Sequence, residues 1–397
     1  MATTKQTKRF RGLNNVSDPL RLRIGWLTKA DNINISDTGR VTRRSGYSAA
    51  LAGSYTGAYS TKDYTRLFVV DGGNLKRVNR DLTTTILRAG LAAAPMHWAE
   101  VNREIFFSNG PDKGIIGADN TTRPWMLDSP STPSVSVGAG TLPEGLYQVA
   151  CTFVLPDGRE TGGGEAARVQ AGENSALVIT SIPQVPGYKT RVYVAPANSA
   201  QFQLASQTTA TSLTWSASPD SLGVNLPNPM TDAAPRAAVQ PAYFAGRMYL
   251  MEYIPSSDTT VVWFSQPLGF HLFDLERNFL MVRGKGVLLA AHTAGLVIGT
   301  TTQIHGFDGQ TLTLLADYGA VPGWSQVTDE NNPTKPLMFW TQRGVCSAFP
   351  FTNLTAERIS VAPGVRAGAA VINEQGARRY VVALQKGDSA FNQRSYP

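Results

Sequence analysis

The feature that most constrains this chain is a module that recurs between residues 64 and 391. Each copy has a short apolar run, a polar turn that contains Gly or Asn, and a second apolar stretch. Short apolar runs bounded by turn residues are typical of β-strands joined as hairpins. The copies lie at residues 64–78, 98–118, 243–267, 296–316, 336–351 and 378–391.

Apart from one gap, the copies follow one another at roughly 35 to 50 residues, which is the period of a β-propeller blade. A unit of this size cannot bury its faces alone, so it must stack on neighbours around an axis. The sequence therefore predicts an all-β protein, a β-propeller of about five to seven blades. Its first part spans residues 51–130, and a linker and its second part span residues 218–397. A plain array of β-sandwiches is the alternative.

The gap, residues 131–217, has a pattern of its own. It opens on a Pro/Ser-rich linker, and a second Pro-rich linker follows at residues 227–241. Between them the sequence predicts an alternating strand, a Pro-Asp-Gly turn at residues 156–158 and three later strands. We expect an inserted antiparallel sandwich of immunoglobulin or fibronectin III type, because its size and strand pattern fit that class. The alternating residues are Tyr147, Val149, Cys151 and Phe153.

Only 16% of the residues are charged, and the chain has 37 Gly and 24 Pro, which disfavours a helical bundle or a coiled coil. The net charge of +7 is concentrated in residues 1–50, which hold ten Lys or Arg and three Asp, so the rest of the chain is neutral. A basic arm on a neutral body suits docking on an acidic partner or contact with nucleic acid, although a solvated tail is the simpler interpretation.

This basic N-terminal arm is predicted to be extended. Residues 29–47 have the pattern of a β-hairpin with an Asp-Thr-Gly turn. Residues 18–32 fit either a short helix capped by Asp18 or an extended segment, since the apolar residues there alternate by two. The charged and apolar side chains proposed as an assembly interface are Arg9, Arg11, Leu20, Arg21, Leu22, Arg23, Ile24, Trp26, Arg43 and Arg44.

No catalytic or metal-binding motif appears in the sequence. The four His residues lack zinc-site spacing, and no nucleophile elbow, phosphate loop or dinucleotide fingerprint occurs. Cys151 and Cys346 are expected to be buried free thiols. The chain shows neither a signal peptide nor an apolar run of about 18 residues, so we expect no membrane-spanning segment. We therefore expect no enzymatic activity, no cofactor and no metal.

The N-terminal arm resembles the opening of phage virion structural proteins. The resemblance is carried by FRGLNNV at residues 10–16, ADNINI at 30–35, DTGRV at 37–41 and RRSGY at 43–47. These segments follow the family pattern in order, and in the family a β-propeller comes next, as in the tail nozzle proteins (tail tubular protein B) of short-tailed phages. The motif covers about 40 residues, and the hairpin repeats extend the likeness loosely.

This resemblance implies a structural role in a virion tail, assembled in the host cytoplasm. Nozzle proteins form a closed homo-oligomeric ring, usually a hexamer, around the channel by which DNA leaves. The implied partners are portal-side adaptor proteins and tail fibres or other tail proteins. DNA would pass transiently without tight binding, because counterion-releasing phosphate contacts would retain the genome.

Three other functions remain open at this stage. One is a tail-tip or baseplate module that binds host-surface glycans through exposed aromatic residues of the insertion, Tyr188, Tyr193 and Phe202. Another is a propeller enzyme that acts on polysaccharide, although candidate carboxylates such as Asp274, Glu276 and Asp317 cannot be paired from sequence. The last is a cellular scaffold.

Overall fold

The computed structural model describes residues 9–36, 38–44, 46, 48–328, 335–374 and 377–387. The all-β prediction is confirmed: the described residues form β-strands in small sheets and three short 3-10 helices, with no α-helix. In the same residues no helix is long and apolar enough to cross a membrane. The 3-10 helices are η1 Pro19–Arg21, η2 Pro219–Ser221 and η3 Pro255–Ser257.

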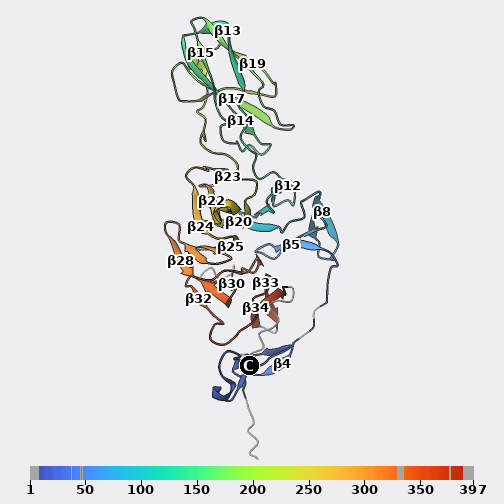
Figure 1. The fold of residues 1–397 in the computed structure, drawn as a ribbon. Coiled ribbons are helices and arrows are strands. Elements are labelled where there is room, and N and C mark those ends of the chain that lie inside the picture. Colours follow the sequence, from blue (N-terminus) through green and yellow to red (C-terminus); the bar gives the residue numbers. More distant parts are fainter. Residues whose placement is uncertain are drawn as a thin grey trace, which may run out of the picture.

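Figure 1 shows an elongated molecule with three regions. A central body holds six sheets formed by residues 55–123 and 239–385. The inserted unit, residues 134–226, projects from one end of the body, and the N-terminal arm, residues 9–44, lies at the other end.

Two sheets of the body come before the inserted unit. Each is an antiparallel meander in which consecutive strands pair, as expected for hairpins joined by short turns. The first sheet contains β5 Tyr55–Ser60, β6 Leu67–Asp71, β7 Asn74–Val78 and β8 Thr84–Arg88. The second contains β9 His97–Val101, β10 Glu104–Ser108, β11 Lys113–Ile116 and β12 Thr122–Arg123.

Four sheets of the body follow the inserted unit. The third contains β20 Val239–Phe244, β21 Arg247–Ile254, β22 Thr259–Gln266, β23 Gly269–Phe273 and β24 Phe279–Arg283. The fourth contains β25 Gly286–His292, β26 Gly295–Thr300, β27 Ile304–Phe307 and β28 Leu312–Ala316. The fifth contains β30 Leu337–Thr341, β31 Gly344–Ala348 and β32 Thr352–Asn353. The sixth contains β29 Gly323–Trp324, β33 Arg366–Glu374 and β34 Ala377–Gln385.

Each sheet of the body buries its apolar residues against the next sheet. The first and second sheets share a core that includes Phe68 and Phe107, and the second and third share one that includes Phe106 and Phe273. Three further cores join the third to the fourth, the fourth to the fifth and the fifth to the sixth. The sheets therefore form a series in which no member is covered without its neighbours.

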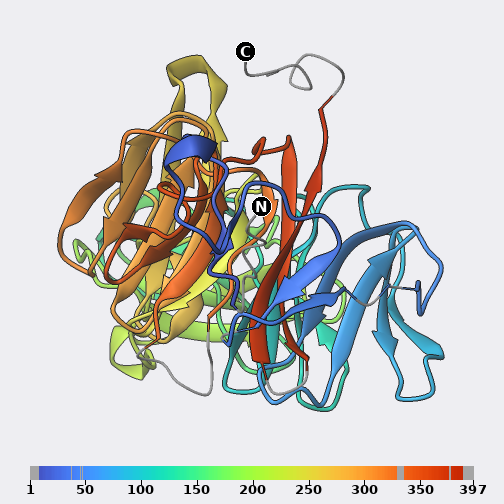
Figure 2. The ribbon, with the colours of Figure 1, turned by 90° about the horizontal axis from the view of Figure 1, so that it is seen from below.

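The series returns to its start, because the sixth sheet lies beside the first two. Trp324 of β29 packs against the core of the first and second sheets, and its ring lies 6.0 Å from the ring of His97 in β9. A groove of about 500 Å³ remains between β5 and the strands β33 and β34. In Figure 2 the red strands of the sixth sheet lie between the blue first sheet and the orange fourth and fifth sheets.

The inserted unit consists of two antiparallel sheets around one core. Tyr147 and Trp215 make an edge-to-face contact in it, with ring centroids 6.4 Å apart. The first sheet contains β13 Ser134–Leu142, β16 Ser175–Thr180 and β19 Leu213–Trp215. The second contains β14 Gly145–Val154, β15 Ala167–Ala171, β17 Lys189–Ala195 and β18 Gln203–Thr208.

Two predicted linkers are more ordered than the sequence suggested. The first contains β13, because Ser134–Ala139 pair with β16 although four of these six residues are Ser, Gly or Ala. The second, residues 227–241, contains the start of β20 and two buried alanines, Ala234 and Ala238, that pack in the core of the second and third sheets. The last predicted module, residues 378–391, is likewise corrected: β34 pairs with the preceding strand β33, and residues 388–391 lie outside the described residues.

The arm contains the predicted hairpin, in which β3 Ile33–Ile35 pairs with β4 Val41–Arg43. The segment at 18–32 is neither a regular helix nor fully extended. It begins with η1, whose cap is Asp18, and ends with β2 Trp26–Leu27, which pairs in parallel with β1 Gly12–Leu13. The helix is one turn long because Asp18 accepts the amide hydrogen of Leu20 but no apolar helical face follows.

Candidate functional site

A cavity of about 440 Å³ lies where the innermost strands of the body converge. Small side chains on five of these strands leave the space open, while Leu337 of the fifth sheet closes part of it. This volume suits a small molecule and is far too small to admit a DNA duplex. The small residues, each from a different sheet, are Ala58, Ala99, Ala242, Ala290 and Ala369.

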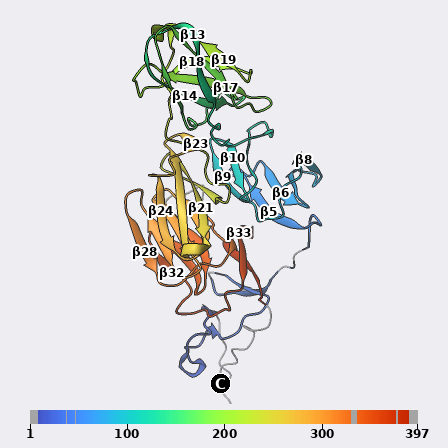
Figure 3. The same ribbon diagram turned by 45° about the horizontal axis from the view of Figure 1, so that its top comes forward.

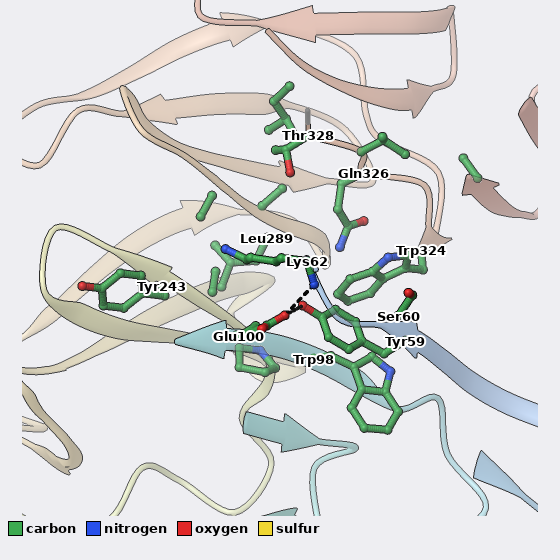
Figure 4. Close-up of a pocket in the computed structure, with 18 of the residues that line it drawn as sticks. Tyr59, Ser60, Lys62, Trp98, Glu100, Tyr243, Leu289, Trp324, Gln326 and Thr328 are labelled. Carbon is green, nitrogen blue, oxygen red and sulfur yellow. Dashed lines mark hydrogen bonds between the residues drawn. The ribbon is translucent and has the colours of Figure 1, made fainter. Parts of the chain in front are cut away.

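Glu100 is the acidic side chain at this cavity. Its Oε2 accepts a hydrogen bond from the Tyr59 hydroxyl at 3.2 Å and another from the backbone N–H of Lys62 at 2.9 Å, as Figure 4 shows. The Tyr59 ring stacks on Trp98 with centroids 5.9 Å apart, which fixes the hydroxyl in place. The carboxylate is therefore held by structural donors, and the described residues that line the cavity include no second carboxylate.

Gln326 and Trp324 form the opposite wall of the cavity (Figure 4). The Gln326 Oε1 atom is buried and has no hydrogen-bond partner among the described residues. Because the two ends of an amide are assigned from their surroundings, Gln326 can present either a donor or an acceptor to the cavity. Within the described residues no three His, Cys, Asp or Glu side chains gather as a metal site.

His97 lies beside Trp324 at the seam between the last and first sheets. Burial, with a smaller contribution from Arg366, lowers the pKa of His97 to about 4, so the ring is neutral at pH 7. Two other candidates for chemistry, His292 and Asp274, have structural contacts. His292 stacks on Phe349 with centroids 5.5 Å apart, and Asp274 accepts two backbone N–H groups of the turn that follows it.

The structure places the predicted interface residues on the arm with different exposures. Leu20 and Ile24 are 95% and 59% exposed, which leaves two large apolar side chains in solvent. Trp26 is half-buried, and the Arg358 guanidinium lies over its ring at 5.3 Å from the centroid. The remaining exposed members are Arg9, Arg11, Arg21, Arg23 and Arg43, and the remaining half-buried ones are Leu22 and Arg44.

The arm is tied to the body through Asn15. Its backbone N–H donates to the Arg358 carbonyl at 3.0 Å, its Nδ2 donates to the Ser360 carbonyl at 2.9 Å, and its Oδ1 accepts the Ser360 N–H at 2.7 Å. A groove of about 680 Å³ runs between this part of the arm and residues 356–361. The arm thus folds back on its own chain, with its apolar tip at Leu20 turned outward.

No protein-family model matches this chain, and no characterised protein matches it in sequence. Solved structures with a distant likeness exist. Virginiamycin B lyase from Staphylococcus aureus, an inactive variant with quinupristin, is 10% identical and matches 83% of this chain and 92% of its own, with a TM-score of 0.33. A protein from Lactobacillus plantarum is 12% identical over 85% and 95% of the two chains, with a TM-score of 0.35. Kuenenia stuttgartiensis hydrazine synthase is 8% identical over 86% and 99%, with a TM-score of 0.36. At these values the likeness carries no conclusion about function.

The inserted unit is joined to the body by more than its two chain connections. Arg159, in the loop between β14 and β15, donates to the Pro124 carbonyl at 2.7 Å and to the Trp125 carbonyl. The Glu160 carbonyl lies 3.0 Å from Nε2 of His271 in β23. Figure 3 shows this end of the inserted unit against β23 and β10. These contacts are a third point of attachment, which restricts rotation about the connecting segments.

The inserted unit does not offer the exposed aromatic set that glycan binding would use. Tyr193 is fully buried, and its hydroxyl donates to Glu160 Oε1 at 2.7 Å, so the expectation that it is exposed is wrong. Tyr188 and Phe202 are half-buried. Tyr193 lies on the same face of β17 as Arg191, opposite to Val192 and Val194 of the core, and it is covered there by the loop that carries Glu160.

The sequence did not single out Glu100, Trp324 or Gln326, which lie up to 226 positions apart and meet only when the sheets close. A usable signal was the alanine on five of the six inner strands, since a small residue in an apolar run marks a place where elements approach an axis. Such a residue is common in strands for other reasons, so the signal becomes informative only when the repeat is aligned by strand.

Proposed function

We propose that this chain is a structural component of a bacteriophage tail, a ring-forming nozzle protein that contributes to the conduit for genome ejection. The observation that carries the proposal is the arrangement of the arm residues on which the family resemblance rests. The Phe10 N–H donates to the Gly39 carbonyl at 2.9 Å, and the Arg11 N–H donates to the Gly25 carbonyl at 2.7 Å. Separate parts of the motif therefore contact one another as one folded element.

Two glycines of this motif, Gly12 and Gly39, lie at positions where the backbone conformation and the nearby atoms disfavour a side chain. Gly39 has a φ of +79°, and a Cβ there would lie 2.6 Å from the Phe10 carbonyl oxygen. Gly12 has a φ of +131°, and a Cβ would lie 3.3 Å from the Trp26 ring. A side chain at either position would strain the backbone or push the strands apart. The motif thus specifies a compact arm, which favours a folded docking element over an unstructured tail.

For the body we propose a β-propeller of six blades. Six sheets that each share a core with the next, a cavity at their inner strands, and a sixth sheet beside the first support this architecture. For the inserted unit we propose an immunoglobulin or fibronectin III-like sandwich, because seven strands are divided into sheets of three and four around one core.

The dimensions of the body bear on where DNA would pass in such a ring. The cavity of about 440 Å³ inside one chain cannot hold a duplex, so the conduit of a nozzle would lie between copies around a ring axis. A closed ring needs heterologous, head-to-tail contacts. The neutral body limits electrostatic repulsion between neighbours and avoids strong phosphate binding, whereas the basic arm suits an acidic surface on a portal-side or tail partner.

Deletion of residues 1–47 tests the proposal. The full chain is expected to form rings with a central hole wide enough for a duplex in negative-stain images. The deleted chain is expected to remain a folded monomer by size-exclusion chromatography and thermal melting, because the arm contributes little to the cores of the body. Rings that persist without the arm would remove its assembly role. A full chain that never forms rings, alone or with tail partners, would overturn the nozzle proposal.

A further inference from the structure

The central cavity is bordered by hydrogen-bonding groups that the protein itself leaves unused. Glu100 accepts both of its hydrogen bonds at Oε2, and no described residue donates to its Oε1. Figure 4 shows Gln326 and Trp324 on the opposite side of the cavity. Neither the Gln326 amide nor the Trp324 indole N–H has a hydrogen-bond partner in the described part of the chain. A carboxylate oxygen, an amide and an indole N–H thus border one space without a partner.

Other tryptophans of the body contrast with Trp324. Trp125, Trp263 and Trp340 each donate the indole N–H to an oxygen of another residue, at 2.8, 3.1 and 2.9 Å. A folded protein usually pairs such groups, because a polar atom withdrawn from water loses its hydration without compensation. Donors and acceptors that stay unpaired around a hollow are available to a ligand.

The charges of the cavity favour a ligand without net charge. Among the described residues that line it, Glu100 is the one acid and Lys62 is the one base, so their formal charges cancel. Figure 4 shows both side chains at the cavity. A cation is attracted by Glu100 and repelled by Lys62, and an anion meets the reverse. A neutral molecule avoids both repulsions.

The rest of the lining is mainly apolar, with aromatic rings held in place from outside the cavity. The Tyr59 ring stacks on Trp98, and the Trp324 ring lies 6.0 Å from the ring of His97. At about 440 Å³ the cavity falls within the range of small-molecule sites, roughly 300 to 1,000 Å³. Fixed aromatic rings beside separate donors and acceptors suit a compact ring that has an apolar face and a rim of hydroxyl groups.

We infer that the central cavity binds a neutral sugar, with hydroxyl groups of one pyranose ring on Glu100, Gln326 and Trp324. A hydroxyl both donates and accepts, so one donates to Glu100 Oε1 while others accept from the Trp324 N–H and pair with the Gln326 amide. The C–H face of the sugar packs on the aromatic side chains. A zwitterion such as an amino acid matches less well, because the two free donors are uncharged and leave its carboxylate unneutralised.

The site binds the sugar and does not cleave it. Glycoside hydrolysis uses two carboxylates at a fixed separation, and Glu100 is the one carboxylate among the described residues of the lining. The inference is independent of ring assembly, since every group that it uses belongs to a single copy.

Calorimetric titration of the full chain with glucose, galactose, mannose and N-acetylglucosamine tests the inference. We expect at least one of them to bind with a Kd on the order of 1 mM or tighter. The bound sugar should raise the melting temperature of the body and leave the transition of the inserted unit in place, because the ligand binds the folded body alone. Glycine and choline serve as zwitterionic and cationic probes. Binding of either without any sugar, or no binding at all, would overturn the inference.

Substitutions place the sugar in the cavity. Gln326→Ala and Trp324→Phe should each weaken binding at least about fivefold, because each removes one hydrogen bond. Glu100→Gln keeps an acceptor for the Tyr59 hydroxyl and should weaken the binding of a sugar without abolishing it. Gln310→Ala is the matched control, since Gln310 is exposed and lies outside the lining. Unchanged affinity in both Gln326→Ala and Trp324→Phe, with native melting, would place the sugar elsewhere and contradict the site.

Oligosaccharides of the sugar that binds best distinguish two sources of the ligand. Affinity that persists for a chain ending in this sugar indicates the end of a polysaccharide. Affinity that is lost as the chain lengthens indicates a free sugar. Both results support a sugar site, and release of reducing ends from the oligosaccharide would contradict binding without cleavage.

Discussion

The inserted unit and the body bury their apolar side chains in different ways. The inserted unit has one core, to which both of its sheets contribute, with Tyr147, Leu177 and Val192 fully buried in it. The body has no core that belongs to one sheet. Each of its cores is shared by two neighbouring sheets, so every sheet between the first and the last contributes to two cores.

This difference sets the units of cooperativity. A region with its own core can unfold and refold while its attachment points persist. A series of sheets with shared cores loses two interfaces when one sheet opens, so the disturbance spreads. We therefore expect two unfolding transitions, one for the inserted unit and one for the whole body, although the strands in the two regions have similar lengths.

The largest effects should come from core truncations matched between the regions. Trp215→Ala in the inserted unit and Phe339→Ala in the body should each destabilise their region by about 3 to 5 kcal/mol, because each removes a large buried aromatic side chain. Differential scanning calorimetry is expected to show that Trp215→Ala lowers the inserted unit's transition alone. Phe339→Ala should lower the melting of all six sheets together.

Hydrogen exchange locates the effect of each truncation. With Phe339→Ala, protection should fall in the first sheet as well as in the fourth and fifth, which contact Phe339 directly. Loss of protection confined to the fourth and fifth sheets would show that the body opens locally and would break the comparison. A Trp215→Ala variant that also lowers the transition temperature of the body would likewise contradict the independent unfolding of the two regions.

Acid should lower the stability of the body at the seam between the sixth sheet and the first two. The stability of the inserted unit should not change for this reason. The pKa of His97 falls from 6.5 to about 4 on folding because the ring is buried. The unfolded chain therefore binds more protons between these values, and stability drops as the pH falls from about 6.5 to 4. The loss is about 3 kcal/mol for the body. Denaturant melts at pH 7 and pH 4 measure it.

His97→Gln is the control for the acid effect, since glutamine does not titrate. Its absolute stability at pH 7 can differ from the native value, but the difference between pH 7 and pH 4 should shrink by about the amount assigned to His97. An unchanged difference would mean that other groups produce the pH dependence. The Trp215-centred core has no buried His, so its transition should move less over the same range.

The sequence predicted local strand pairs well because they depend on local alternation. The arm hairpin pairs Ile35 with Val41, as the pattern indicated. Strand β13 was missed because its Ser, Gly and Ala residues resemble a linker, and only its pairing with β16 makes it a strand. The partner of β34 was missed because the following Gly387 looked like the hairpin turn, whereas the chain pairs backward with β33.

The candidate site was harder to predict from the sequence than the fold was. The arm motif is contiguous, so its residues could be named in advance. The central cavity combines single residues from all parts of the body. Its lining depends on which elements become neighbours, a property that one strand's pattern does not contain.

The smallest effect concerns the arm, which has neither kind of core and is held largely by polar contacts. Asn15→Ala removes the side-chain bonds to Ser360 in a partly exposed setting, so it should cost about 1 kcal/mol. Exchange of amides in residues 10–28 should quicken while the transitions of the body and the inserted unit stay in place. Asn15→Asp keeps an acceptor for the Ser360 N–H and loses the donor, so its exchange rates should fall between those of the native chain and Asn15→Ala. If Asn15→Ala instead lowers the body's melting temperature by several degrees, the arm is part of the body's cooperative unit and the division into three regions is wrong. The expected result separates the two roles of the arm: contacts that hold it to its own chain are weak, and the apolar tip at Leu20 stays available to a neighbour.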